Sequence, residues 1–118
     1  NATALILASG EGHLEVVQEL LRAGANKDQQ ADSGNTALHQ ASHNGKITVV
    51  QALVEAGASL SLRGYQNKTA LETARDRGHT ECARILEQAE AAVARRAQQV
   101  QDQQQQQQQG AAAAAGNT

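Results

Sequence analysis

The sequence contains no Pro, Phe, Met or Trp, and its only aromatic residue is Tyr65. A single cysteine, Cys82, cannot form an internal disulfide framework, which excludes the small disulfide-stabilised domains of secreted proteins. No apolar run approaches the roughly 18 residues needed to cross a bilayer, so a transmembrane protein is excluded. The net charge of −2 gives no overall attraction to nucleic acid or to anionic lipid.

Large apolar residues are few, but they are concentrated in one part of the chain. Of the 21 Leu, Ile and Val residues, 19 precede residue 87, whereas the chain from Gln88 consists largely of Ala and Gln. Low-complexity tracts of this kind bury too little surface to offset their ordering entropy. We therefore expect one compact domain over residues 1–91 and an Ala/Gln-rich tail over residues 92–118. The composition of the tail favours helix to about Gln101 and disorder over Gln103–Thr118.

The domain consists of three tandem units that repeat every 33 residues. The triplet Thr-Ala-Leu occurs at residues 3–5, 36–38 and 69–71, and the same offset relates Leu20, Leu53 and Leu86. The units span residues 1–33, 34–66 and 67–91. Repeats of this length indicate a structure in which each unit buries its apolar face against the next one.

Each unit is predicted to contain two short helices and an extended loop, or finger. In the second unit, Thr36 is placed to cap the first helix, and Gly45 and Gly57 are placed to end the two helices. The apolar residues between these glycines recur at helical spacing. The segment 58–68 has turn residues and alternating Leu60 and Leu62, which predicts an extended finger before the third unit.

These motifs resemble those of the ankyrin repeat family. The family's opening Thr-Pro-Leu-His appears as Thr-Ala-Leu-His at residues 36–39, its Gly-His and following Leu/Val helix as residues 12–21, and its closing Gly-Ala-Asn as residues 24–26. Ala replaces Pro in all three openings, and Ile6 and Glu72 stand where His39 stands in the second unit. The resemblance implies an all-α repeat solenoid, an ankyrin-type stack of helix-turn-helix units with hairpin fingers, followed by the low-complexity tail.

The two ends of the predicted stack differ. In the third unit, Arg75, Glu87 and Glu90 replace the small or apolar residues that occupy the same positions in the first two units. A polar outer face is what a terminal repeat needs. The first unit is apolar at Ile6, Leu7, Val16 and Leu21, so we expect further repeats before Asn1 in a longer protein.

No motif for catalysis or metal binding is convincing. His79 and Cys82 have a spacing that can hold a metal, but they align with a helix start and with core valines, and no further ligand is evident. His39 and His43 suit acid–base chemistry, yet the resemblance implies a structural role for His39. No phosphate-binding glycine loop or nucleophile elbow occurs. We therefore expect a protein that is not an enzyme, with no cofactor, metal or small-molecule substrate.

The resemblance implies that the protein binds another protein through the first helix of each unit and the fingers. Gly10, Ser33, Leu62 and Thr73 belong to this surface but are not the main candidates. The residues expected to contact the partner are Leu7, Glu11, Gln29, Gln30, Asp32, Gln40, His43, Asn44, Arg63, Tyr65, Gln66, Asp76 and Arg77. Tyr65 and Arg63 are the strongest candidates, since Tyr and Arg contribute most to measured interface energies.

Self-association through the tail is the alternative function. The last helix continues at a spacing of three to four residues through Leu86, Ala89, Val93, Arg96 or Ala97, and Val100, and a Gln run promotes association. Interspersed acidic residues in the third unit argue against nucleic acid as the partner. We expect a monomer without membrane insertion. The free cysteine and the family favour an intracellular location, cytoplasmic or nuclear.

Overall fold

The chain folds into helices joined by short turns and two longer fingers. A computed structural model describes the backbone of residues 3–116 and the side chains of residues 3–98. Within residues 3–116 there is no strand. The elements are α1 (Ala4–Glu11), α2 (Leu14–Arg22), α3 (Ala37–His43), α4 (Ile47–Glu55), the 3₁₀ helix η1 (Tyr65–Asn67), α5 (Ala70–Asp76) and α6 (Thr80–Gly116).

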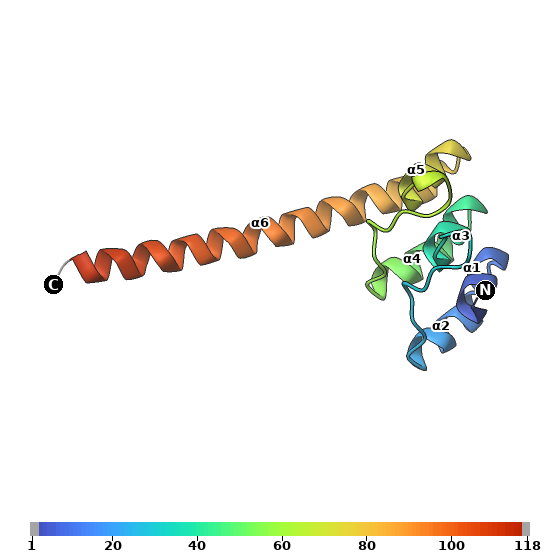
Figure 1. Cartoon of the computed structure of the whole chain (residues 1–118), viewed down its shortest axis with the longest axis horizontal. Helices are drawn as coiled ribbons and strands as arrows, with labels where there is room; N and C mark the ends of the chain where they lie inside the picture. Colours follow the sequence, from blue (N-terminus) through green and yellow to red (C-terminus); the bar gives the residue numbers. More distant parts are fainter. Residues whose placement is uncertain (1–2, 117–118) are drawn as a thin grey trace.

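The helices form two layers along the stack (Figure 1). One layer contains α1, α3 and α5, and the other contains α2, α4 and the first turns of α6. Each unit contributes one helix to each layer, and each helix pair packs on the pairs beside it. This arrangement confirms the all-α repeat stack that the sequence predicts.

Threonine starts the first helix of every unit. The side chains of Thr3, Thr36 and Thr69 each accept a hydrogen bond from a backbone N–H of the first turn. In the second and third units, the side chains of His39 and Glu72 complete a capping box by accepting a hydrogen bond from the backbone N–H of the threonine. The threonine cap therefore sets the helix start where proline is absent.

Glycine ends the helices, as predicted. Gly45 and Gly57 have φ values of 69° and 88°, in the left-handed region that L side chains rarely adopt. Beyond Gly45, the N–H of Lys46 donates to the carbonyl of Ala41 at 2.9 Å and satisfies an otherwise unpaired helix end.

The core is built from aliphatic side chains between the layers. Val54 is half-buried and Ile47 is exposed, so the predicted apolar stripe of α4 is only partly buried. The fully buried large side chains include Leu5, Leu38, Leu53, Leu86, Val17, Val49, Val50 and Cys82. Because burial of apolar area stabilises a fold by about 25 cal/mol per Å², the regular supply of Leu and Val compensates for the missing aromatics.

The N-terminal side of the stack is uncovered. Val16 is 48% exposed, whereas Val49 and Cys82, which occupy the same position in the next two units, are fully buried. Ala4 is exposed, and its counterpart Ala37 is buried. In the second and third units, the preceding helix pair covers these positions.

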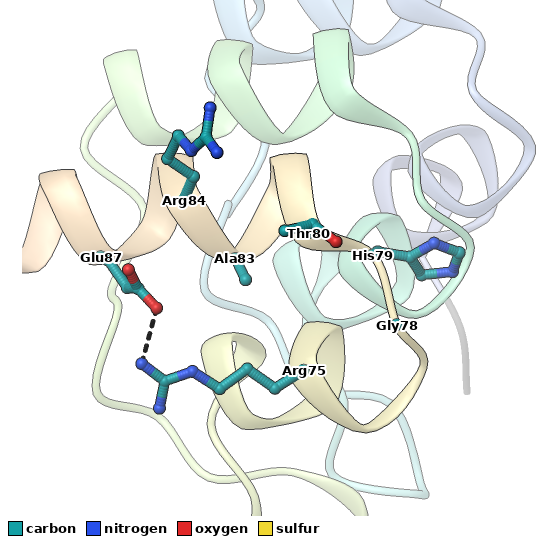
Figure 2. Close-up of a pocket in the computed structure, with 7 residues that line it drawn as sticks. All are labelled: Arg75, Gly78, His79, Thr80, Ala83, Arg84 and Glu87. Carbon is teal, nitrogen blue, oxygen red and sulfur yellow. Dashed lines mark hydrogen bonds and ion pairs between the residues drawn. The ribbon is translucent and has the colours of Figure 1, made fainter.

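The C-terminal side is charged instead. Figure 2 shows Arg75 of α5 and Glu87 of α6 pointing toward each other, with Arg75 Nη2 and Glu87 Oε1 2.6 Å apart. They line a pocket of about 370 Å³ at the end of the stack. Ser9 and Ser42, at the position of Arg75 in the first two units, are fully buried between helix pairs. The third unit thus has the polar outer face expected of a last repeat.

Helix α6 is much longer than α2 and α4, which have 9 residues each. The side chains of residues 91–98 are all exposed, and α6 extends well beyond the stack (Figure 1). Its backbone stays helical to Gly116, past the predicted helix end near Gln101, because Ala and Gln favour helix. The predicted disorder of residues 103–118 remains a prediction; their side chains, and Asn117 and Thr118 entirely, lie outside the described residues. Among residues 3–116, no helix is both long and apolar enough to span a membrane.

Candidate functional site

A pocket of about 210 Å³ lies where the second finger (residues 58–68) approaches the ends of α3 and α5. We call it the fingertip pocket. Its lining residues are Asn35, His43, Tyr65, Gln66, Lys68, Thr73, Asp76 and Arg77. The structure therefore brings together five residues of the predicted partner-binding set, from the end of α3, the second finger and the end of α5.

Tyr65 stands at the tip of the second finger, and its ring is exposed. The residue is 62% accessible, and its backbone N–H donates to Asn35 Oδ1 at 2.8 Å. Beside it, a Cβ at Gly64 would lie 2.3 Å from the same Asn35 oxygen, so glycine permits the close approach. The backbone of the finger is thus held against the first finger (residues 25–35), while the aromatic ring projects away from it.

The turn beside Tyr65 has an uncommon backbone. Gln66 and Asn67 have φ values of 59° and 60°. Asn tolerates this left-handed conformation, but for Gln it costs about 1–2 kcal/mol. Such strain is typical of functional loops held in place by their surroundings.

His39 lies beneath the pocket and links α3 to the second finger. Its Nε2 is 2.9 Å from the carbonyl oxygen of Lys68, and its Nδ1 is 2.8 Å from Thr36 Oγ1. Since a carbonyl only accepts, Nε2 carries the proton and Nδ1 accepts from the Thr36 hydroxyl. Burial lowers the pKa of His39 and keeps the ring neutral. The side chain is 1% exposed, in keeping with the structural role that the family resemblance implies.

Most charges around the fingertip pocket are paired. Lys68 Nζ forms an ion pair with Asp76 Oδ2. Arg63 Nη1 lies 3.3 Å from Glu72 Oε1 and also donates to the carbonyl of Asn67 at 2.9 Å. Arg63 therefore connects the second finger to α5, which is a structural role that the prediction did not foresee.

Glu72 is oriented for this contact by its helix cap. Hydrogen bonds from the backbone N–H and then the hydroxyl of Thr69 lower the pKa of the Glu72 carboxyl, and the charge of Arg63 lowers it further. The carboxylate is therefore charged at neutral pH and available to hold Arg63.

Of the predicted residues on α1 and α3, only His43 lines the fingertip pocket. Leu7 is exposed on α1 and Gln40 is half-buried on α3. Glu11 Oε2 lies 2.9 Å from His13 Nε2 within the same unit. Leu7 is thus the main apolar contact surface that α1 offers.

Several predicted residues hold neighbouring units together. Gln30 Nε2 donates to the carbonyl of Arg63 at 3.1 Å, and Asn44 Nδ2 donates to the carbonyl of Gly10 at 2.7 Å. Gln29 makes hydrogen bonds only within the first finger, where Asp32 is also exposed. The side-chain amides of Gln30 and Asn44 are therefore used in contacts within the stack.

Three residues of the pocket are not among the main predicted contacts, although Thr73 is predicted to belong to the same surface. Asn35 and Lys68 are equivalent positions just before the threonine caps, and Thr73 faces them from α5. The 33-residue alignment relates Asn35 to Lys68, but only the folded finger brings both residues to the same cavity.

His79 and Cys82 have structural positions. His79 Nε2 donates to the carbonyl of His43 at 2.9 Å and so joins the third unit to the second. Cys82 is fully buried in the core, and burial raises the pKa of its thiol. Across the described residues, no group of three His, Cys, Asp or Glu side chains is placed to hold a metal.

Repeated helix pairs with fingers at their edge define a helical repeat protein. A family model described as ankyrin repeats, in three copies, matches residues 5–97, and the chain belongs to this family. Ankyrin repeats are in general modules that bind other proteins. No curated protein matches the chain.

Proposed function

We propose that this chain is a protein-interaction module that binds its partner with the fingertip pocket, the exposed residues of α1 and the half-buried Gln40 of α3. The observation that carries the proposal is the exposed ring of Tyr65 on a finger whose backbone is fixed by Asn35. An aromatic side chain on a fixed backbone has few rotatable bonds to order on binding and contributes a large contact area. No catalytic role is proposed.

The proposal is tested by capturing a partner with the full chain and measuring its affinity for variants. Tyr65→Ala should weaken binding by about 2 kcal/mol or more, while the thermal midpoint stays unchanged. Gln51→Ala, exposed on α4 in the other layer, is the matched control and should bind normally. A partner that is sensitive to Gln51 and indifferent to Tyr65 would place the binding surface elsewhere.

Self-association through α6 is the second candidate, and Val93 favours it. Val93 of α6 is 58% exposed. It lines a groove of about 570 Å³ with Ala58 and Leu60. An antiparallel pair of α6 helices centred on Val93 would place Glu90 of one copy near Arg96 of the other, because each lies three residues from Val93.

Two features restrict this second candidate. Leu86 belongs to the core, so the free apolar stripe starts at Ala89, and the side chain of Val100 lies outside the described residues. The mass in solution of the full chain, of Val93→Glu and of a chain ending at residue 91 distinguishes the two functions. A dimer that is lost in both variants supports self-association, whereas monomers throughout exclude it.

A further inference from the structure

One positive charge in the fingertip pocket has no acidic partner. Lys68 is neutralised by Asp76 across the pocket. Among the residues whose side chains are described, Arg77 makes no ion pair or hydrogen bond through its guanidinium group, although it lines the same cavity. The pocket therefore has a net positive charge at the end of α5.

The polar lining adds a hydrogen-bond donor and no free acidic group. Asn35 Oδ1 accepts from the N–H of Tyr65, which leaves the NH₂ group of the same amide without a partner among the described residues. The hydroxyl of Thr73 is used, because it donates to the carbonyl of Thr69 at 2.9 Å. An incoming group thus meets Arg77, the Asn35 amide and the exposed Tyr65 ring.

We propose that the fingertip pocket binds an anionic side chain of an extended partner segment, either a carboxylate or a phosphate ester. This inference rests on the proposed function, since it names the chemistry that the interaction surface recognises. Arg77 is the counter-ion and the Asn35 amide a second donor, because the planar guanidinium group matches both carboxylate and phosphate. The Tyr65 ring packs beside the anion, against the neighbouring part of the segment. A cavity of about 210 Å³ holds one side chain and not a folded element.

Short capped peptides with the sequence Gly-Ser-Gly-X-Gly-Ser-Gly test the proposal. X is Glu, Gln, phosphoserine or Ser, and binding to the full chain is followed by the amide NMR shifts of residues 64–68 and 77. We expect saturable shifts with Glu or with phosphoserine, and none with the neutral Gln and Ser peptides. The tighter of the two anionic peptides identifies the source of the anion.

Variants of the full chain provide the matched controls. Arg77→Gln should weaken the anionic peptide about tenfold, because a hydrogen bond to a charged group is lost, and Arg77→Lys should restore part of the affinity. Arg22→Gln makes the same charge change at an exposed site on α2 and should bind like the unmodified chain. Raising the salt concentration should weaken binding in parallel.

Several results would overturn the inference: equal shifts with Glu and Gln peptides, no saturable shift with either anionic peptide, or an Arg77→Gln variant that binds normally. The proposed function is judged separately. If binding of a captured partner depends on Tyr65 but tolerates Arg77→Gln, the proposed interaction surface is supported and the proposed binding of an anionic side chain is rejected. If the partner tolerates both changes, the proposed function fails as well.

Discussion

His39 Nε2 lies 2.9 Å from the carbonyl oxygen of Lys68, 29 residues further along the chain. This one contact connects the start of α3 in the second unit to the base of the fingertip that carries Tyr65. The position of the second finger therefore depends in part on a neutral, buried imidazole.

Stability should fall in mildly acidic solution because of His39. Burial lowers its pKa in the folded chain below 6.5, so the unfolded chain binds more protons between the folded pKa and 6.5. The contribution is complete above pH 6.5 and is lost as the pH falls through 6.5 toward the folded pKa. Urea unfolding at pH 7.5 and 5.5 should show a smaller pH effect for His39→Gln than for the exposed control His13→Gln. Equal effects in the two variants would contradict this assignment.

The middle unit should contribute most to cooperative stability. Leu53→Ala removes a fully buried side chain that is covered on both sides and should cost about 2–5 kcal/mol. Leu20→Ala is the matched change in the first unit, where the same position is only half-buried, and should cost distinctly less. Denaturant unfolding measures both. Equal losses of unfolding free energy in the two variants would contradict the prediction, because the first unit is covered on one side and the second unit on both.

Removing a buried hydroxyl should stabilise the stack. Ser42 Oγ is buried and has no hydrogen-bond partner among the residues that the structure describes. Ser42→Ala should therefore raise the free energy of unfolding by about 1 kcal/mol, because an unsatisfied polar group is removed with little change in volume. Ser61→Ala, on the exposed second finger, is the control and should have no effect. A loss of stability in Ser42→Ala would indicate a bound water at this site.

The strained backbone at Gln66 predicts that a substitution there stabilises the chain. Gln66→Gly should stabilise the chain by up to about 1 kcal/mol, since glycine adopts a φ of 59° without strain. The same change at Gln51, inside α4, should destabilise by about 1 kcal/mol. Thermal melts distinguish the two, and a destabilised Gln66→Gly would mean that its side chain supports the turn.

Deletion of residues 103–118 should leave the unfolding midpoint of the stack unchanged. The side chains of residues 91–98 are already exposed, and the deletion begins beyond them. Amides in the Gln run should exchange at the earliest time point, because an unsupported helix opens readily. Slow exchange throughout this run in a dilute monomer would instead support a stable helix to Gly116.

What sequence could predict here was local or periodic. The Thr36 cap and the Gly45 helix end depend on residues within one turn. The 33-residue period then relates each of these positions to the equivalent positions of the other two units. Contacts between fingers depend on the folded path, so the structural roles of Arg63 and Gln30 were missed. Both were predicted as partner contacts from their type and place, but Arg63 holds Glu72, and the Gln30 amide holds the carbonyl of Arg63. The length of α6 was also missed, because composition alone sets no end to an Ala/Gln helix.

The side-chain hydrogen bonds between units have a mechanical consequence. His39 to Lys68, Asn44 to Gly10 and His79 to His43 join residues only 29, 34 and 36 positions apart. Links that connect only adjacent units break in sequence when the two ends of the chain are pulled. Each step would release about 110 Å of extended chain, the length of one 33-residue unit. The stack therefore yields to tension one unit at a time, and its outermost pair opens first.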